Sequence, residues 1–435
     1  MLDRLTVLSD PESWQPLLDR LNRRHAPVPE VERDTQAMLD AVRLHGDEAL
    51  LDYTRRFDCA DFVPPLLVDR KAVHDALTAV DADDVAIIRE AAANIKTFHQ
   101  AQKQESWFLT RPDGTILGQK LDPVDRAGLY VPGGTGGNTP LISTLLMTAI
   151  PAQVAGVGCI AVVTPPRKDG TVNPYILAAA HILGIEEVYR VGGAWSIAAL
   201  AYGTQSIPRV DVIAGPGNIW VTTAKRLVQG HVGIDMLAGP SEVLILADEN
   251  ARPDWIAVDM LSQAEHDSLA SAICLTASSS LAEQVLQELK TQCAALPRAA
   301  LAEKALDDWS IVGVLPHMDD AIALANAIAP EHLEIMTDSP WNILPRIRHA
   351  GAVFMGHHTP EALGDYFAGP NHVLPTLGTA RFSSALSVQT FTKRTSVIAA
   401  SPAFAAASAH PVARLARLEA LEAHARSMES RNSGN

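Results

Sequence analysis

The sequence predicts an α/β protein built from two doubly wound, Rossmann-like domains with mostly parallel sheets, plus a small C-terminal helical extension. Beyond Asn138, helix-like stretches alternate with short apolar runs. Such alternation implies right-handed βαβ crossovers and parallel sheets with helices on both faces. The expected strands are more than one mononucleotide-binding half requires, so we expect two domains. They lie at 160–163, 187–191, 210–213, 243–246, 273–275, 311–315 and 352–355.

The composition is that of an ordinary globular chain with an acidic balance. The 435 residues carry a net charge of −15, which argues against nucleic acid or an anionic membrane as partner, because either needs a basic face. The N-terminus lacks a signal-peptide pattern, and no apolar run approaches the ~20 residues that span a bilayer. The four cysteines show no Cys-x-x-Cys spacing, so neither a disulfide framework nor a thiolate zinc site is indicated. We therefore expect a cytoplasmic protein that acts on small molecules.

The chain before the alternation is expected to be mostly helical. The pattern over 10–104 is that of helices punctuated by prolines, which we interpret as scaffold. Short alternating stretches at 109–121 predict a hairpin. The segment 128–134 then predicts a strand that ends in a Gly-rich turn.

Three Gly-rich turns, at 133–137, 192–193 and 215–218, each follow an apolar run and precede a helix. This arrangement puts backbone N–H groups and the positive end of a helix dipole at the carboxyl edge of a strand, where a pyrophosphate can bind. None of the turns matches G-x-G-x-x-G, and the alternative is that glycine merely permits a tight turn. Three such turns in one domain favour the interpretation that this domain binds a nucleotide.

The stretch 237–266 offers the first polar pair with a chemical use. The apolar run 243–246 predicts a buried strand, and apolar residues at i, i+3, i+4 and i+7 predict a helix over 254–266. Gln263 and His266 would then be neighbours on one helix face, able to bind one metal ion or substrate. The alternative is a solvated helix end.

Two later segments carry groups suited to proton transfer. Glu331 and His332 are adjacent, and an imidazole titrates near neutrality. The loop 364–375 crowds Asp365, an amide and His372 among turn residues, and function concentrates in such loops. Each segment is weak evidence when taken alone.

From about Arg381 the alternation is lost, and a helical period predicts an amphipathic helix over 412–428. This helix carries Glu419 and His424. As isolated residues, a carboxylate and a histidine on a terminal helix are typical of a solvated surface.

Taken together, the segments resemble the histidinol dehydrogenase family from Tyr130 to His424. The resemblance rests on several long motifs in the same order. They are Gly-Leu-Tyr-Val-Pro-Gly-Gly, Gly-Pro-Gly-Asn, Ala-Gly-Pro-Ser-Glu-Val, Ser-Gln-Ala-Glu-His, Pro-Glu-His-Leu-Glu, Gly-Pro-Asn-His-Val-Leu-Pro and Glu-Ala-His-Ala-Arg.

The resemblance implies a role for each candidate residue. Glu331 and His332 would be the catalytic pair. One zinc ion per subunit would be held by Gln263, His266, Asp365 and His424. The substrate L-histidinol would be bound by Ser241, Gln263, His266, His332, Asp365, His372, Glu419 and His424, and NAD by Tyr130, Asn218 and the position of Trp195.

The resemblance also implies a division of the chain and a homodimer. Residues 27–129 and 243–386 would form a first domain with the catalytic and metal residues, and 130–242 a second, NAD-binding domain. Residues 1–26 would be an N-terminal arm, and 387–435 a dimerisation extension. The last helix of one subunit would complete its partner's site, so that His424 and Glu419 act in trans.

The sequence departs from the family at three places. Trp195 occupies a position where the family usually has a glutamine that contacts the nucleotide. The turn at Gly133 carries extra residues at 135–138, and Asp267 replaces the glycine expected after His266. The last two changes remove no ligand.

The implied reaction is the oxidation of L-histidinol through L-histidinaldehyde to L-histidine, with two NAD reduced. His332 would act as general base, and Glu331 would activate water at the aldehyde stage. The cysteines match no family motif, so a thiohemiacetal route finds no support. The alternatives are a related enzyme for another alcohol, such as sulfopropanediol, a zinc hydrolase, and a non-catalytic nucleotide-binding protein.

Overall fold

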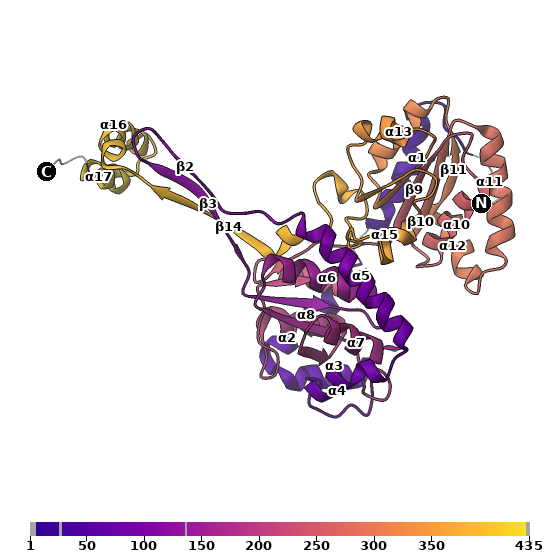
Figure 1. Ribbon diagram of the computed structural model, residues 1–435, viewed down its shortest axis with the longest axis horizontal. Helices are drawn as coiled ribbons and strands as arrows, with labels where there is room; N and C mark the ends of the chain where they lie inside the picture. The colour runs from indigo at the N-terminus through magenta and orange to yellow at the C-terminus, as the bar shows by residue number, and fades with distance from the viewer. Residues whose placement is uncertain (1–5, 26–27, 135–136, 432–435) are drawn as a thin grey trace. The chain divides into compact units, whose positions relative to one another are not determined.

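The computed structural model describes residues 6–25, 28–134 and 137–431 (Figure 1). They form two compact units, one within 1–102 and 125–391, the other within 103–124 and 392–435. The predicted arm of residues 1–26 and the predicted Gly-rich turn at 133–137 lie partly outside the described residues. None of the helices in the described ranges combines the length and apolar composition needed to cross a bilayer.

The first unit contains a six-stranded parallel sheet in the order β1-β11-β10-β9-β12-β13. Alternate residues of β9 face opposite sides: Val243 and Ile245 join one core, whereas Leu244 and Leu246 join the other. Helices therefore cover both faces, as the long apolar runs predict. The strands are β1 (Thr6–Val7), β9 (Glu242–Ala247), β10 (Ser271–Thr276), β11 (Ile311–Val314), β12 (His332–Met336) and β13 (Ala352–Met355). The helices are α1 (Pro11–Asn22), α10 (Pro253–Ala264), α11 (Ser279–Cys293), α12 (Ala299–Trp309), α13 (Met318–Ile328), α14 (Pro340–Ile343) and α15 (Glu361–Tyr366).

The same unit contains a five-stranded parallel sheet in the order β6-β5-β4-β7-β8. Its strands are β4 (Arg126–Tyr130), β5 (Cys159–Thr164), β6 (Glu187–Arg190), β7 (Val212–Ala214) and β8 (Gly233–Ile234). Its helices are α6 (Ile142–Ala155), α7 (Pro174–Ile182), α8 (Gly193–Tyr202) and α9 (Ile219–Val228). Two parallel sheets with crossover helices confirm the predicted fold class.

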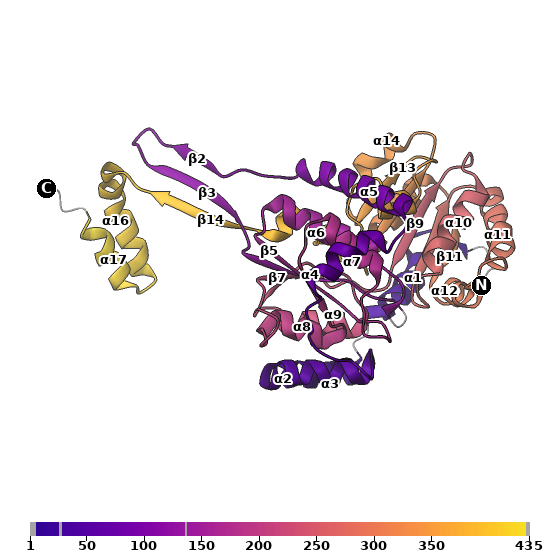
Figure 2. The ribbon, with the colours of Figure 1, turned by 60° about the horizontal axis from the view of Figure 1, so that its bottom comes forward.

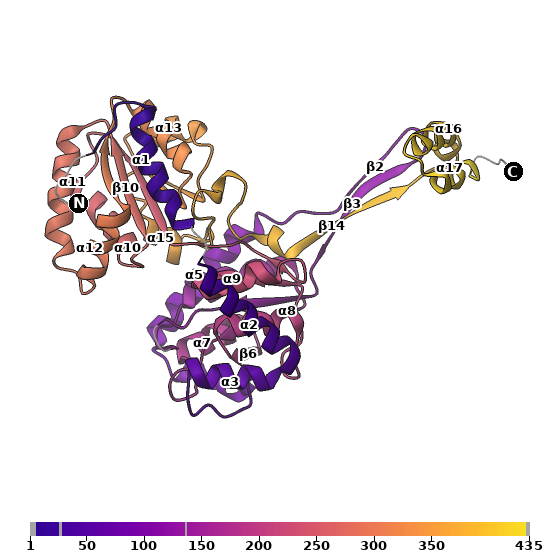
Figure 3. The ribbon, with the colours of Figure 1, turned by 180° about the vertical axis from the view of Figure 1, so that it is seen from behind.

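The N-terminal helices do not pack on the sheet that was expected from the predicted division of the chain. They are α2 (Pro29–His45), α3 (Asp47–Phe57), α4 (Arg70–Asp75) and α5 (Ala82–Gln100). Helix α2 lies beside α8 and α9 (Figures 2 and 3). Leu39, Val42 and Leu50 share a core with residues of α8 and α9, and α5 contacts α6. Residues 28–100 and β4 thus belong with the five-stranded sheet, and not with the six-stranded sheet as expected for 27–129. An apolar helix face shows that a helix is buried, but not against which sheet.

The second unit is an antiparallel sheet with a helical pair. Strands β2 (Trp107–Thr110), β3 (Ile116–Pro123) and β14 (Thr392–Ala399) pair in the order β14-β3-β2, which confirms the predicted hairpin. The expected continuous helix over 412–428 is wrong. The segment forms α16 (Pro402–Leu418) and α17 (Glu422–Glu429), because Ala420 between them adopts a left-handed φ of 59° that ends the first helix.

Candidate active site

The catalytic candidates meet at the amino ends of two neighbouring strands. His332 opens β12, which runs parallel to β9 and pairs with it so that His332 lies opposite Val243. Ser241 and Glu331 immediately precede the two strands. Parallel pairing therefore brings together residues about 90 positions apart in the sequence. A local sequence pattern could not have predicted this contact.

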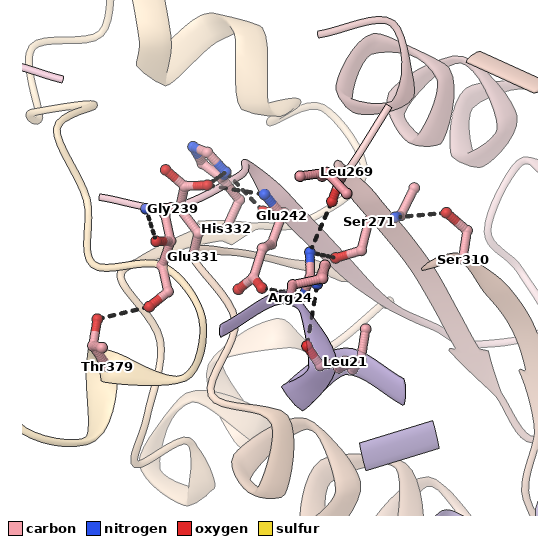
Figure 4. Close-up of polar contacts among 12 residues, drawn as sticks. Leu21, Arg24, Gly239, Glu242, Leu269, Ser271, Ser310, Glu331, His332 and Thr379 are labelled. Carbon is pink, nitrogen blue, oxygen red and sulfur yellow. Dashed lines mark hydrogen bonds and ion pairs between the residues drawn. The ribbon is translucent and has the colours of Figure 1, made fainter. Parts of the chain in front are cut away.

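The peptide groups of Glu242 hold both catalytic side chains (Figure 4). Its N–H donates to Oε2 of Glu331 at 2.9 Å, and its carbonyl lies 2.9 Å from Nδ1 of His332. Because a carbonyl can only accept, Nδ1 carries the proton, and the lone pair of the neutral ring lies on Nε2. Nε2 has no hydrogen-bond partner among the described residues and lies 3.6 Å from Oδ1 of Asp365. His332 is thus oriented as a base with a free Nε2.

Burial sets the protonation of this pair. Burial raises the pKa of Glu331 to about 8, although His332 opposes the shift. Burial alone would lower the pKa of His332, but Glu361, Glu331 and Asp365 together raise it well above its usual value. Two groups that titrate near or above neutrality in one buried place are typical of acid–base catalysis.

Three of the four expected metal ligands lie in the first unit. Gln263 is in the last turn of α10 and Asp365 is in α15, whereas His266 follows the end of α10, so the expectation that His266 is helical is wrong by a few residues. Burial lowers the pKa of both His266 and His372, and the charge of Asp365 opposes both shifts. Nδ1 of His372 donates to the carbonyl of Asp365 at 2.9 Å.

Glu361 is a member of the site that the sequence did not reveal to us. His332, Glu361 and Asp365 offer ligand atoms within 4.8 Å of one another. In the amide orientation that satisfies its hydrogen-bond partners, the nitrogen of Gln263 donates to both carboxylate oxygens of Glu361 at 2.8 Å. Glu361 precedes Asp365 by four residues on α15. This spacing puts both carboxylates on one face of a helix, and it could have identified Glu361 from the sequence.

Glu419 and His424 belong to the second unit, where Glu419 caps α16 and His424 lies in α17. The expected ligand set therefore draws on both units. Asp365 also lines a cavity of about 300 Å³ with Phe98 and Phe354, a size suited to a small molecule.

The Gly-rich turns lie at the carboxyl ends of β4, β6 and β7, as predicted. Tyr130 ends β4, and Asn218 caps α9 by accepting from the N–H groups of Trp220 and Val221 at 3.1 and 3.2 Å. A Cβ on Gly215 would lie 2.2 Å from the carbonyl oxygen of Tyr130, so only glycine allows the two turns to approach. This edge can present backbone N–H groups to a phosphate.

Comparison with known proteins agrees with this geometry. A family model for histidinol dehydrogenase matches residues 21–432. The chain belongs to the histidinol dehydrogenase family. It is 65% identical to the histidinol dehydrogenase of Nitratidesulfovibrio vulgaris over 99% of both chains. It is 50% identical to that of Bacillus subtilis, over 93% of this chain and 94% of the other.

A solved structure of histidinol dehydrogenase from Elizabethkingia anophelis superposes with a TM-score of 0.91. The two are 35% identical and 98% of each chain is covered. Membership of the histidinol dehydrogenase family confirms the resemblance seen in the sequence. It makes the chain an NAD-dependent oxidoreductase of histidine biosynthesis.

The structure shows what two of the residues that depart from the histidinol dehydrogenase pattern contact. Trp195 is 6% exposed, and its ring stacks on Phe57 and Tyr53 of α3 with centroids 5.4 and 5.7 Å away. Most of the indole is therefore used in packing. Asp267 accepts from the N–H of Leu269 at 2.8 Å and so closes the turn between α10 and β10.

Proposed function

We propose that the enzyme oxidises L-histidinol through L-histidinaldehyde to L-histidine at the amino ends of β9 and β12, with Glu331 and His332 as the catalytic pair. The observation that carries the proposal is the orientation of His332. Its Nδ1 is fixed on the carbonyl of Glu242, while Nε2 is unpartnered within the described chain and lies beside Asp365. A substrate hydroxyl held near Asp365 would meet Nε2, which acts as the base in the neutral form of the ring.

The donor set fits zinc. Gln263, His266 and Asp365, with His424 from a second copy of the chain, would supply an amide oxygen, a carboxylate and two imidazoles, which are suitable zinc ligands. The hydrogen bonds from the amide nitrogen of Gln263 to Glu361 support this assignment because they engage the nitrogen, and an amide binds a cation through its oxygen. When bound, zinc supplies an anchor for the imidazole and amine nitrogens of the substrate.

Protons are moved by the chain's own residues, while bound NAD supplies the hydride acceptor in each oxidation. In the alcohol step, Nε2 of His332 takes the hydroxyl proton as hydride leaves the carbon. In the aldehyde step, Glu331 takes a proton from water as the water oxygen bonds to the carbonyl carbon, and protonated His332 returns its proton to the carbonyl oxygen to complete the hydrate. Neutral His332 then accepts a hydroxyl proton of the hydrate as hydride leaves the carbon. Burial raises the pKa of Glu331 to about 8, close enough to neutrality for the carboxyl both to take up and to release a proton.

Tyr130 and Asn218 would contact NAD at the edge where β4 and β7 end, with the position of Trp195 as a third contact. We also propose a homodimer whose subunits exchange α16 and α17, so that the substrate contacts of Ser241, Glu419 and His372 come from two chains. A cytoplasmic location suits the four free thiols.

The test is NADH formation by the purified protein, with L-histidinol and sulfopropanediol as separate substrates. We expect two NADH per histidinol, a strong preference for histidinol, and loss of activity after chelation that zinc restores. An equal or faster rate with the sulfonate would overturn the choice of substrate. A hydrolase would show no NAD-dependent absorbance change with either alcohol.

A further inference from the structure

Glu242 is the point on which the catalytic pair depends. Its N–H bonds Glu331 and its carbonyl bonds His332, both at 2.9 Å. No side-chain substitution removes these two backbone bonds, so the geometry of the pair is controlled by whatever fixes the peptide groups of Glu242. Its side chain is the obvious means, since Glu242 is only 3% exposed and is anchored by an ion pair.

The partner in that ion pair is Arg24, which lies in a short 3-10 turn (Arg23–His25) after α1 (Figure 4). Its guanidinium also donates to the carbonyl of Leu269 at 3.2 Å and to Oγ of Ser271 at 3.1 Å. Nε donates to the carbonyl of Leu21 at 3.3 Å. Arg24 therefore ties the first residue of β9 to the first residue of β10 and to the end of α1.

A buried ion pair is a poor device for stability alone, because desolvation of both charges offsets much of their attraction. The side chain of Arg24 is 1% exposed and that of Glu242 is 4% exposed, so both are desolvated. The pair nevertheless lies at the one residue whose two peptide groups hold both catalytic side chains. The position of the ion pair therefore indicates that it fixes the geometry of these two side chains.

We propose that Arg24 and Glu242 are positioning residues for the dehydrogenase reaction, which fix the Glu242 peptide groups and through them Glu331 and His332. The inference rests on the proposed roles of that pair. Loss of the ion pair would let the start of β9 shift, and a misplacement of about 1 Å can lower a rate about 100-fold. Since neither residue is a proposed ligand of zinc or NAD, kcat falls while zinc content and the KM for NAD hold.

The test compares Arg24→Met, Glu242→Gln and the double variant, with Arg20→Met as the matched control. Arg20 donates to the carbonyl of Ser310 at 3.2 Å from the same arm and has no bond to Glu242. We expect each single variant to lower kcat for both oxidations about 10- to 100-fold, with an unfolding midpoint in urea below that of the wild type. Arg20→Met should keep the wild-type kcat.

The double variant separates positioning from simple stability. It leaves no lone buried charge, so its urea midpoint should recover toward the wild type, whereas its kcat should stay low. If kcat recovers together with the midpoint, or if folded single variants keep the wild-type kcat, the inference is wrong.

A readout without substrate keeps this test independent of the proposed function. In protein labelled with ¹⁵N-histidine, the His332 resonances are identified by their loss in His332→Asn. The Nδ1–H resonance should shift between the wild type and Arg24→Met, because its hydrogen bond to the carbonyl of Glu242 changes. Unchanged resonances in Arg24→Met would overturn the positioning role even if the enzyme proved to act on another alcohol. Failure of the wild type to oxidise histidinol would instead count only against the proposed function.

Discussion

At the scale of single residues, the two catalytic side chains differ in their hydrogen bonding. His332 has a free Nε2 and would take a proton in both oxidations, whereas Glu331 would act only when water is added to the aldehyde. We therefore predict that Glu331→Gln slows histidinaldehyde oxidation about 10²- to 10⁴-fold but histidinol oxidation much less, whereas His332→Asn slows both. Single-turnover NADH formation with each substrate measures this. Equal losses in the two steps for Glu331→Gln would refute the division of labour.

Another prediction concerns Asp58, which follows α3 far from the catalytic pair in sequence. Burial raises its pKa to about 7, although Lys168 opposes the shift, and its Oδ2 has no partner among the described residues. The folded pKa lies above the unfolded value, so the contribution of this carboxyl to stability is greatest at low pH and is lost as the pH rises toward 7.

Asp58→Asn should therefore raise the free energy of unfolding more at pH 8 than at pH 5. We expect a difference of about 1–2 kcal/mol, below the full linkage value because the carboxyl keeps some contact with solvent. Urea unfolding at both pH values measures it, with the exposed Asp61→Asn as control. The same change in stability at pH 5 and pH 8 would contradict the assignment.

At the scale of elements, a buried ion pair holds the turn at 215–218. Lys225 of α9 pairs with Asp235, and their side chains are 2% and 0% exposed. Asp235 accepts from the N–H of Gly215 at 2.8 Å, and Lys225 donates to the carbonyl of Gly215 at 3.0 Å. The pair thus fixes a turn that leads directly to Asn218.

We predict that Asp235→Asn raises the KM for NAD about tenfold, a loss of about 1.4 kcal/mol in binding, and leaves the zinc content unchanged. The cause would be a turn that no longer holds its N–H groups in place. Initial rates over a range of NAD concentrations measure the KM. Asp308→Asn, which breaks the exposed pair with Lys304, is the control and should leave the KM unchanged. A KM for Asp235→Asn within twofold of the wild type would count against the role of the turn.

At the scale of the whole molecule, the proposed site needs two chains. His266→Ala and His424→Ala should each be inactive as homodimers, because each lacks one zinc ligand. If His424 acts in trans, a hybrid dimer has one site with both defects and one intact site. An equal mixture, unfolded and refolded together, should therefore recover about a quarter of the wild-type activity. No recovery in a mixture that does form hybrid dimers would place His424 in its own subunit's site.

Local patterns in the sequence predicted much of the fold. The runs that became β5, β9, β10 and β11 were recognisable because strands buried on both faces are continuously apolar. β12 was missed as a strand because His332 and Glu334 interrupt its apolar run. These polar groups are buried for chemistry and not for packing, so they hide the strand from a pattern based on hydrophobicity.

The candidate site was predicted only in part. Glu331, His332 and Asp365 carry chemistry that the sequence and its family resemblance disclose, but Glu361, Glu242 and Arg24 do not stand out. Their roles come from what they contact, since Glu361 bonds Gln263 and Arg24 bonds Glu242 across more than 200 residues of sequence. A lone arginine after a helix has no distinguishing local pattern.

The sequence by itself determined which segments are strands, which turns need glycine and which side chains can donate, accept or ligate, because these properties depend on residue type and local period. Only the tertiary structure decided that β9 lies beside β12, that α2 and α3 cover the five-stranded sheet, and that the proton of neutral His332 lies on Nδ1. Strand order and packing partners are set by contacts between distant segments, and the free energy of those contacts does not appear in any local pattern.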